Sequence, residues 1–225
     1  MSDTSARKVL FMWAGDENFH SPKAISEMLA AELAARGWSV RIENSFAPLD
    51  DLEAMQELDL IVPAWTMGDL PTPRWVNLSK SVAAGVGIGG VHGGMGDAFR
   101  KNLSYQWMVG GQFVAHPYSG PYSVRLTKQK SPITDGMASS FEYSSEQYYM
   151  MIDPSIAVLA ETGIAHNGQD VVMPVVWTKK WGQGRVFYSS LGHAAEEFQK
   201  YPEVLAMTVR GLLWAAESKT AAAAT

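Results

Sequence analysis

The chain has 225 residues, of which 47% are hydrophobic, 11% aromatic and 18% charged, a composition that excludes a disordered or fibrous protein and favours a single domain over residues 1–225. The net charge of −5 argues against nucleic acid and anionic membranes as partners. The absence of cysteine excludes disulfides, thiolate metal sites and a cysteine nucleophile.

The first predicted element is a strand of a buried parallel sheet at residues 9–14, because this continuous apolar run ends at Gly15. A helix follows, with Ser21 as N-cap, Pro22 at its first position and Gly37 beyond its end. The same alternation continues with three strands and two helices, at residues 40–43, 60–64 and 86–91 and at residues 51–58 and 73–84. Strands that alternate with helices predict a mostly parallel, doubly wound sheet whose ligand crevice lies at the carboxyl ends of the strands.

This alternation of strands and helices is interrupted at residues 105–153, which we interpret as an aromatic-rich insertion or lid that contains a strand at 122–126. Three further strands are predicted, at residues 156–160, 171–177 and 184–190. The last two are joined by a hairpin turn at residues 179–182. A final helix begins at Pro202, and the alanine-rich tail after residue 217 is expected to fray. No apolar stretch has the length of a membrane span and no signal peptide is recognised, so we expect a cytoplasmic protein.

A nucleotide cofactor is not expected, although Gly85, Gly87 and Gly90 match a G-x-G-x-x-G spacing. In a dinucleotide-binding fold these glycines form the first turn between strand and helix, whereas here they lie inside or before a later strand. The true first turn carries Asp16 and Glu17, whose charges would repel a diphosphate.

Three histidines, His20, His92 and His193, stand where a predicted strand has just ended or a helix is about to begin. These positions converge on one edge of a doubly wound sheet, and neutral imidazoles serve there as base, acid or metal ligand. Any one of them alone is more often a structural histidine, and no H-x-x-x-H or H-E-x-x-H motif is present. Glu146 lies among aromatic residues, where desolvation would raise its pKa towards that of a useful acid or base; a solvated loop glutamate is the alternative.

Tryptophan and tyrosine are frequent in the same loops, and such rings suit a polyol, whose C–H faces stack on them while its hydroxyls find polar partners. Ordinary core packing accounts for at least half of these rings. Substrate binding is predicted for Trp65, Asp69, Gly93, His116 and Tyr148.

The ordered set of motifs resembles the ThuA-like family, named for trehalose utilisation. The motifs run from about residue 8 to 215 and are NFHS at 18–21, GIGGVHG at 87–93, GGQFVAHP at 110–117, SPITDG at 131–136, SEQY at 145–148, PVVW at 174–177, GRVFY at 184–188 and LGH at 191–193. The resemblance implies a class I glutamine-amidotransferase-like fold, a flavodoxin-like three-layer α/β/α sandwich. Glutamine amidotransferases of this fold carry a cysteine where this chain has His92, so glutaminase chemistry is excluded.

Two segments depart from the family pattern. Residues 65–69 read WTMGD where the namesake branch has a Trp-Gly-His stretch, which argues against trehalose itself as substrate. Residues 131–133 read SPI where many relatives have His-Pro-Ile.

The family occurs with sugar dehydrogenases. The resemblance therefore implies that the protein acts on a disaccharide, a glycoside or a 3-keto-glycoside, and that a sugar dehydrogenase belongs to the same pathway. One hypothesis is a lyase, hydrolase or isomerase in which His92 or Glu146 removes the acidic C2 proton of a 3-keto sugar. A divalent Zn, Mn or Fe ion, held by some of His20, His92, Glu146 and His193, would polarise the keto oxygen. A two-carboxylate glycosidase is less favoured, since only Glu146 stands out. The alternative hypothesis is a non-catalytic sugar-binding or dehydrogenase-partner protein, and the sequence leaves a homo-oligomer open.

Overall fold

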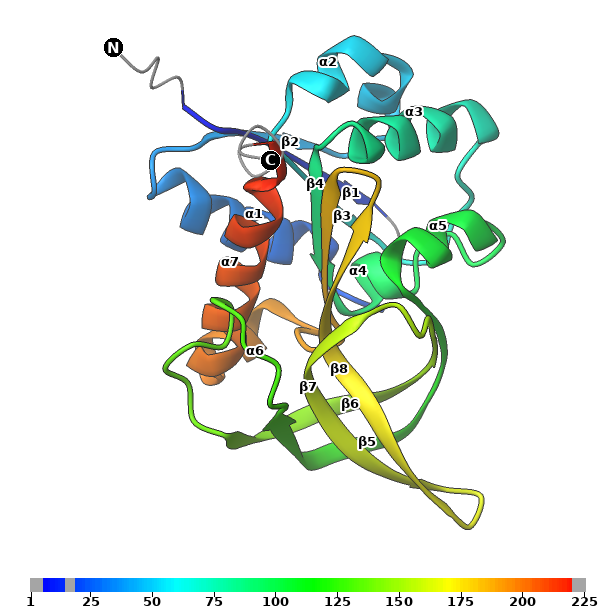
Figure 1. The fold of residues 1–225 in the computed structure, drawn as a ribbon, viewed down its shortest axis with the longest axis vertical. Coiled ribbons are helices and arrows are strands. Elements are labelled where there is room, and N and C mark those ends of the chain that lie inside the picture. Colours follow the sequence, from blue (N-terminus) through cyan, green and yellow to red (C-terminus); the bar gives the residue numbers. More distant parts are fainter. Residues whose placement is uncertain (1–5, 15–18, 220–225) are drawn as a thin grey trace.

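The computed structural model describes residues 6–14 and 19–219. Asp16 and Glu17 of the first turn, the motif residue Asn18 and the tail at 220–225 lie outside the described residues. The described residues form one nine-stranded sheet with the strand order β2-β1-β3-β4-β9-β8-β7-β5-β6 (Figure 1). No helix among them is long and apolar enough to cross a membrane.

One half of the sheet is parallel. Its strands are β2 (Ser39–Glu43), β1 (Lys8–Ala14), β3 (Leu60–Trp65), β4 (Gly87–Val91) and β9 (Gly184–Ser189). Successive side chains of a strand point to opposite faces, and both faces are buried here: Val9 and Phe11 enter one apolar cluster, Leu10 and Met12 the other. This two-sided burial explains why these strands read as continuous apolar runs in the sequence.

Helices cover both faces of the parallel half. The first face packs against α1 (Pro22–Ala34), α6 (Ala195–Lys200) and α7 (Pro202–Ala216). The second face packs against α2 (Leu52–Glu57), α3 (Thr72–Ala83) and α5 (Leu103–Val109), with the 3-10 turn η1 (Ala47–Asp50) and the short α4 (His92–Gly96) nearby. The predicted α/β class is therefore confirmed.

The other half of the sheet is antiparallel, which corrects the prediction of a mostly parallel, doubly wound sheet. It consists of β8 (Gln169–Trp181), β7 (Ala157–His166), β5 (Gly111–Leu126) and β6 (Ser140–Ile152). The predicted hairpin turn does join β8 to β9, with Trp181 opposite Gly184. The region interpreted as an insertion or lid is the end of α5 followed by the β5–β6 hairpin, and the strand predicted at 122–126 is only the last part of β5.

Candidate functional site

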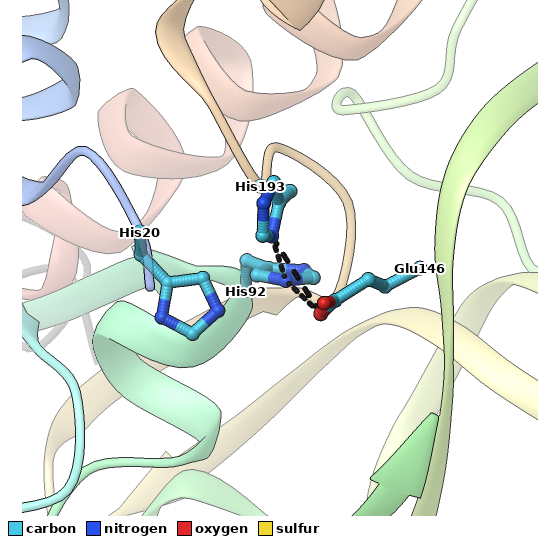
Figure 2. A group of neighbouring side chains, drawn as sticks. All are labelled: His20, His92, Glu146 and His193. Carbon is cyan, nitrogen blue, oxygen red and sulfur yellow. Dashed lines mark hydrogen bonds and ion pairs between the residues drawn. The ribbon is translucent and has the colours of Figure 1, made fainter. Parts of the chain in front are cut away.

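Four side chains from four separate segments converge at the boundary between the two halves (Figure 2). His20 precedes α1, His92 follows β4, His193 follows β9, and Glu146 projects from β6. One ligand atom of each lies within 4.8 Å of those of the other three. The structure thus brings together the three histidines at element ends and the carboxylate from the antiparallel half.

His92 forms the sharp bend between β4 and α4, with a φ of 44°, and its side chain is only 1% exposed. Its Nδ1 lies 2.7 Å from the Ser190 carbonyl oxygen. Because a carbonyl only accepts hydrogen bonds, Nδ1 carries a hydrogen and donates it to Ser190, which leaves Nε2 as the ring nitrogen that faces the other members of the group. The ring of Tyr148 packs against the imidazole at 4.0 Å between centroids. These contacts fix the orientation of the His92 ring.

The Nε2 side of His92 faces Glu146 and His193. His92 Nε2 lies 3.2 Å from Glu146 Oε2 and 3.1 Å from His193 Nδ1. Partial burial by itself would raise the pKa of Glu146, but the hydrogen bonds with His193 and His92 outweigh it and hold that pKa well below the ordinary value. The expectation of a raised pKa for this carboxyl was therefore wrong. The hydrogen bond between Glu146 and His193 also raises the pKa of His193.

His20 completes the group from the side of the parallel half. Its Nδ1 lies 2.7 Å from Thr66 Oγ1 and its Nε2 lies 3.3 Å from the hydroxyl of Tyr148. Burial, assisted by the neighbouring imidazoles, lowers the pKa of His20 to about 3, so the ring is neutral at physiological pH. A Cβ on Gly93 would lie 2.3 Å from His20 Cε1. Gly93, which is predicted to bind substrate, also leaves the space that the His20 ring occupies.

The spacing of the donor atoms is close to that around a divalent cation. Atoms that share a tetrahedral ion at about 2.0–2.2 Å lie about 3.3–3.6 Å apart. The distances from His92 Nε2 to His193 Nδ1 and to Glu146 Oε2 are 3.1 and 3.2 Å, and His193 Nδ1 lies 3.6 Å from Glu146 Oε2. Two imidazole nitrogens and a carboxylate oxygen form a donor set suited to Zn, Mn or Fe, and the hydrogen bond of His92 to Ser190 is the outer-sphere contact that such ligands usually make.

Glu146 also borders a cavity of about 260 Å³. The cavity is lined by Phe19, His20, Thr66, Met67, Asp97, Arg100, Phe113, His116, Glu146 and Tyr148. The half-exposed His116 lies here, with Nε2 3.7 Å from Glu146 Oε1. The two carboxylate oxygens therefore have different surroundings: Oε2 faces the buried His92 and the partly exposed His193, and Oε1 faces His116.

The sequence analysis did not identify the positively charged side chain in this cavity, which is that of Arg100. Arg100 donates from Nε and Nη2 to the carboxylate of Asp97, at 2.5 and 2.8 Å, and the Asp97 side chain is almost fully buried. Its guanidinium lies 5.3 Å from the ring centroid of Phe113. The available signal was an aspartate and an arginine three residues apart just after the GIGGVHG motif, which the structure brings together in the turn that follows α4.

Two residues predicted to bind substrate lie away from this cavity. Trp65 stacks on Phe46, with ring centroids 3.3 Å apart, and packs at the edge of an apolar cluster. Asp69 is exposed, and its carboxylate is 3.1 Å from Lys101 Nζ. His116 and Tyr148 do line the cavity.

A family model described as "ThuA: Trehalose utilisation" matches residues 8–215. Among solved structures, a putative ThuA-like protein from Bacteroides uniformis is 17% identical with a TM-score of 0.74, covering 93% of this chain and 91% of that one. A putative ThuA-like protein from Parabacteroides merdae is also 17% identical with a TM-score of 0.74, covering 94% and 90%. A cytoplasmic protein from Salmonella typhimurium is 12% identical with a TM-score of 0.63, covering 92% and 98%. Comparison with curated proteins gave no match.

Proposed function

The chain belongs to the ThuA family, whose description places it in sugar metabolism, and we propose that it is an enzyme in which Glu146 removes a proton from a sugar or keto-sugar. The observation that carries this proposal is the two-sided environment of one carboxylate. Its Oε2 is held by His92 and His193, while its Oε1 lies on the side of His116 in a cavity of about 260 Å³. The lowered pKa of Glu146 keeps it ionised at neutral pH, which is the protonation state that a base requires.

The cavity is suited to a single sugar ring. Its volume is just below the range of about 300–1,000 Å³ typical of small-molecule sites. Phe19, Phe113 and Tyr148 provide aromatic surface for the C–H faces of such a ring. The guanidinium of Arg100, fixed by Asp97, provides hydrogen-bond donors for oxygen atoms of the ligand.

The reaction we propose is an elimination on a 3-keto-glycoside. Glu146 accepts the C2 proton, which the neighbouring ketone makes acidic, a C1–C2 double bond forms, and the C1–O bond breaks. His116, at the exposed side of Glu146, donates a proton to the departing oxygen. We assign the base to Glu146 and not to His92, because His92 is almost fully buried and is not among the residues that line the cavity. A divalent cation bound by His20, His92, His193 and Glu146 would polarise the keto oxygen.

Elemental analysis of the purified protein tests the cation. We expect about one Zn, Mn or Fe per chain in the wild type and its loss in His193→Gln and His20→Gln. The matched control is His166→Gln, which changes a histidine at the exposed end of β7 and keeps the ion. Equal metal content in all four proteins would contradict this ligand set.

Turnover of a 3-keto-glycoside tests the chemistry, with release of the C1 substituent as the readout. Glu146→Gln should lose about 10³-fold in turnover, and Glu142→Gln, an exposed position on the same strand, should be fully active. Full activity of Glu146→Gln would overturn the assignment. Saturable sugar binding by the metal-loaded wild type without any product would favour a non-catalytic sugar-binding protein.

A further inference from the structure

A second cavity, of about 430 Å³, lies beside the first. It is lined by Gly68, Asp69, Leu70, Thr72, Trp75, Phe99, Lys101, Asn102, Leu103 and Ser104. The lining therefore comes from the segment after β3 and from the segment that leads into α5. The proposed reaction uses none of these residues. Asp69, which the sequence analysis singled out for substrate binding, lies here.

The two cavities share a wall made from these same two segments. Met67 and Ala98 pair as an isolated parallel bridge, in which Met67 N–H donates to the Asp97 carbonyl at 2.9 Å and Phe99 N–H donates to the Met67 carbonyl at 2.8 Å. Thr66, Met67, Asp97 and Arg100 line the inner cavity, whereas Gly68, Asp69, Phe99 and Lys101 of the same two segments line the outer one. The wall thus presents one surface to each cavity.

The wall is built from strained backbone. Four non-glycine residues of the described part of the chain have a positive φ, and two of them, Met67 at 57° and Phe99 at 53°, lie in this wall. A third, His92, lies at the inner site. Non-glycine residues rarely adopt this conformation, and where they do the surrounding structure usually holds them for a functional reason. The strained backbone of its wall therefore distinguishes the outer cavity from an ordinary surface depression, in addition to its volume.

The lining of the outer cavity has two chemical characters. Trp75 and Leu103 contribute apolar surface, and Leu103 is 71% exposed. Asn102, Thr72 and Ser104 contribute hydroxyl and amide groups. This combination matches a ring that is apolar on its faces and hydroxylated at its edge.

The charges argue for a neutral ligand. Asp69 and Lys101 form an ion pair at the rim, with Lys101 Nζ 3.1 Å from Asp69 Oδ1, so the two charges of the lining cancel. A phosphate or a carboxylate would gain the lysine but face the aspartate. A sugar hydroxyl can accept from the ammonium group and donate to the carboxylate at the same time. From these observations we propose that the outer cavity is a second saccharide-binding site, separate from the site that contains Glu146.

Protein-observed NMR with glucose as probe tests this site directly. The indole N–H signal of Trp75, one of eight tryptophans, is identified by its disappearance in Trp75→Phe. We expect this signal to shift saturably as glucose is added to the wild type. The apparent dissociation constant should rise about tenfold in Asp69→Ala, which removes one charged hydrogen-bond partner. Leu103→Arg, which fills the rim, should abolish the shift.

The controls separate this site from the catalytic proposal. Val172→Arg introduces the same charge at an exposed valine of β8 and should leave the Trp75 shift unchanged. Glu146→Gln should also leave it unchanged, so that loss of turnover and loss of outer-cavity binding are scored independently. Absence of a saturable shift, or a shift insensitive to both Asp69→Ala and Leu103→Arg, would overturn the proposal. A response to inorganic phosphate in place of glucose would equally overturn it, because it would make this an anion site.

Discussion

The parallel and antiparallel halves supply the candidate site in different ways. His92 and His193 follow parallel strands, so the topology of the parallel half alone brings them to one edge. Glu146 lies inside β6, and its direction depends on the register with β5, where it pairs with Ser119 just past two register shifts. A slip of one residue would turn Glu146 to the opposite face of the sheet. The histidines are thus positioned by topology and the carboxylate by register.

The strongest way to break this arrangement is to remove the carboxylate. Glu146→Gln should lower turnover by about 10³-fold, because a positioned base contributes about 10²–10⁴-fold. Glu146→Asp keeps the charge but draws it back by one methylene, and a misplacement of about 1 Å costs about 10²-fold. Steady-state kinetics on a 3-keto-glycoside should therefore rank wild type, Asp and Gln in that order. Equal rates for Asp and wild type would show that charge, and not the position that the register sets, is the critical property.

A second way is to remove the contacts of Lys179, which join β8 to the segment after β6 and to α5. Lys179 of β8 donates to the Asp153 carboxylate and to the backbone carbonyl of Trp107 in α5, and the lysine side chain is only 6% exposed. Lys179→Met leaves Asp153 as an unpaired, largely buried charge, so we expect a loss of about 3 kcal/mol in the free energy of unfolding. Urea denaturation measures it. The neighbouring exposed Lys180→Met should cost less than about 0.5 kcal/mol, and a similar cost for both variants would contradict the role of the pair.

The parallel half could largely be predicted from the sequence, and the antiparallel half could not, for a physical reason. Strands buried on both faces, such as residues 9–14 and 60–64, are continuous apolar runs. β5 and β6 have long, partly exposed stretches, and β5 is interrupted by glycine and proline, so their residues show neither an apolar run nor a clean alternation. The same contrast applies to the site. Strand-end histidines were recognisable, whereas the environment that lowers the pKa of Glu146 depends on contacts with residues far away in the chain.

The Lys179–Asp153 contact also predicts how stability depends on pH. Desolvation opposes ionisation of Asp153, but hydrogen bonds from Lys179 and Ser155 hold its pKa below the ordinary value of 3.8. A lowered folded-state pKa contributes stability above the unfolded pKa, and this contribution is lost as the pH falls through the folded-state value. The difference in unfolding free energy between wild type and Asp153→Asn should therefore be constant above about pH 5 and shrink below about pH 4. A difference that stays constant down to pH 3 would contradict this.

The smallest expected effect concerns the backbone of the parallel half. His92→Ala and His92→Gly both remove the imidazole, so they lose its contacts equally and differ mainly in backbone preference. At a φ of 44° a Cβ costs about 1–2 kcal/mol, whereas glycine elsewhere costs about 0.5–1 kcal/mol of chain entropy. His92→Gly should therefore be the more stable variant by about 0.5–1 kcal/mol in urea denaturation. At Glu27, an exposed position within α1, the order should reverse, with alanine more stable than glycine by about 1 kcal/mol. Alanine more stable at both positions would mean that the bend after β4 stores no strain, and that the topology of the parallel half presents His92 without conformational cost.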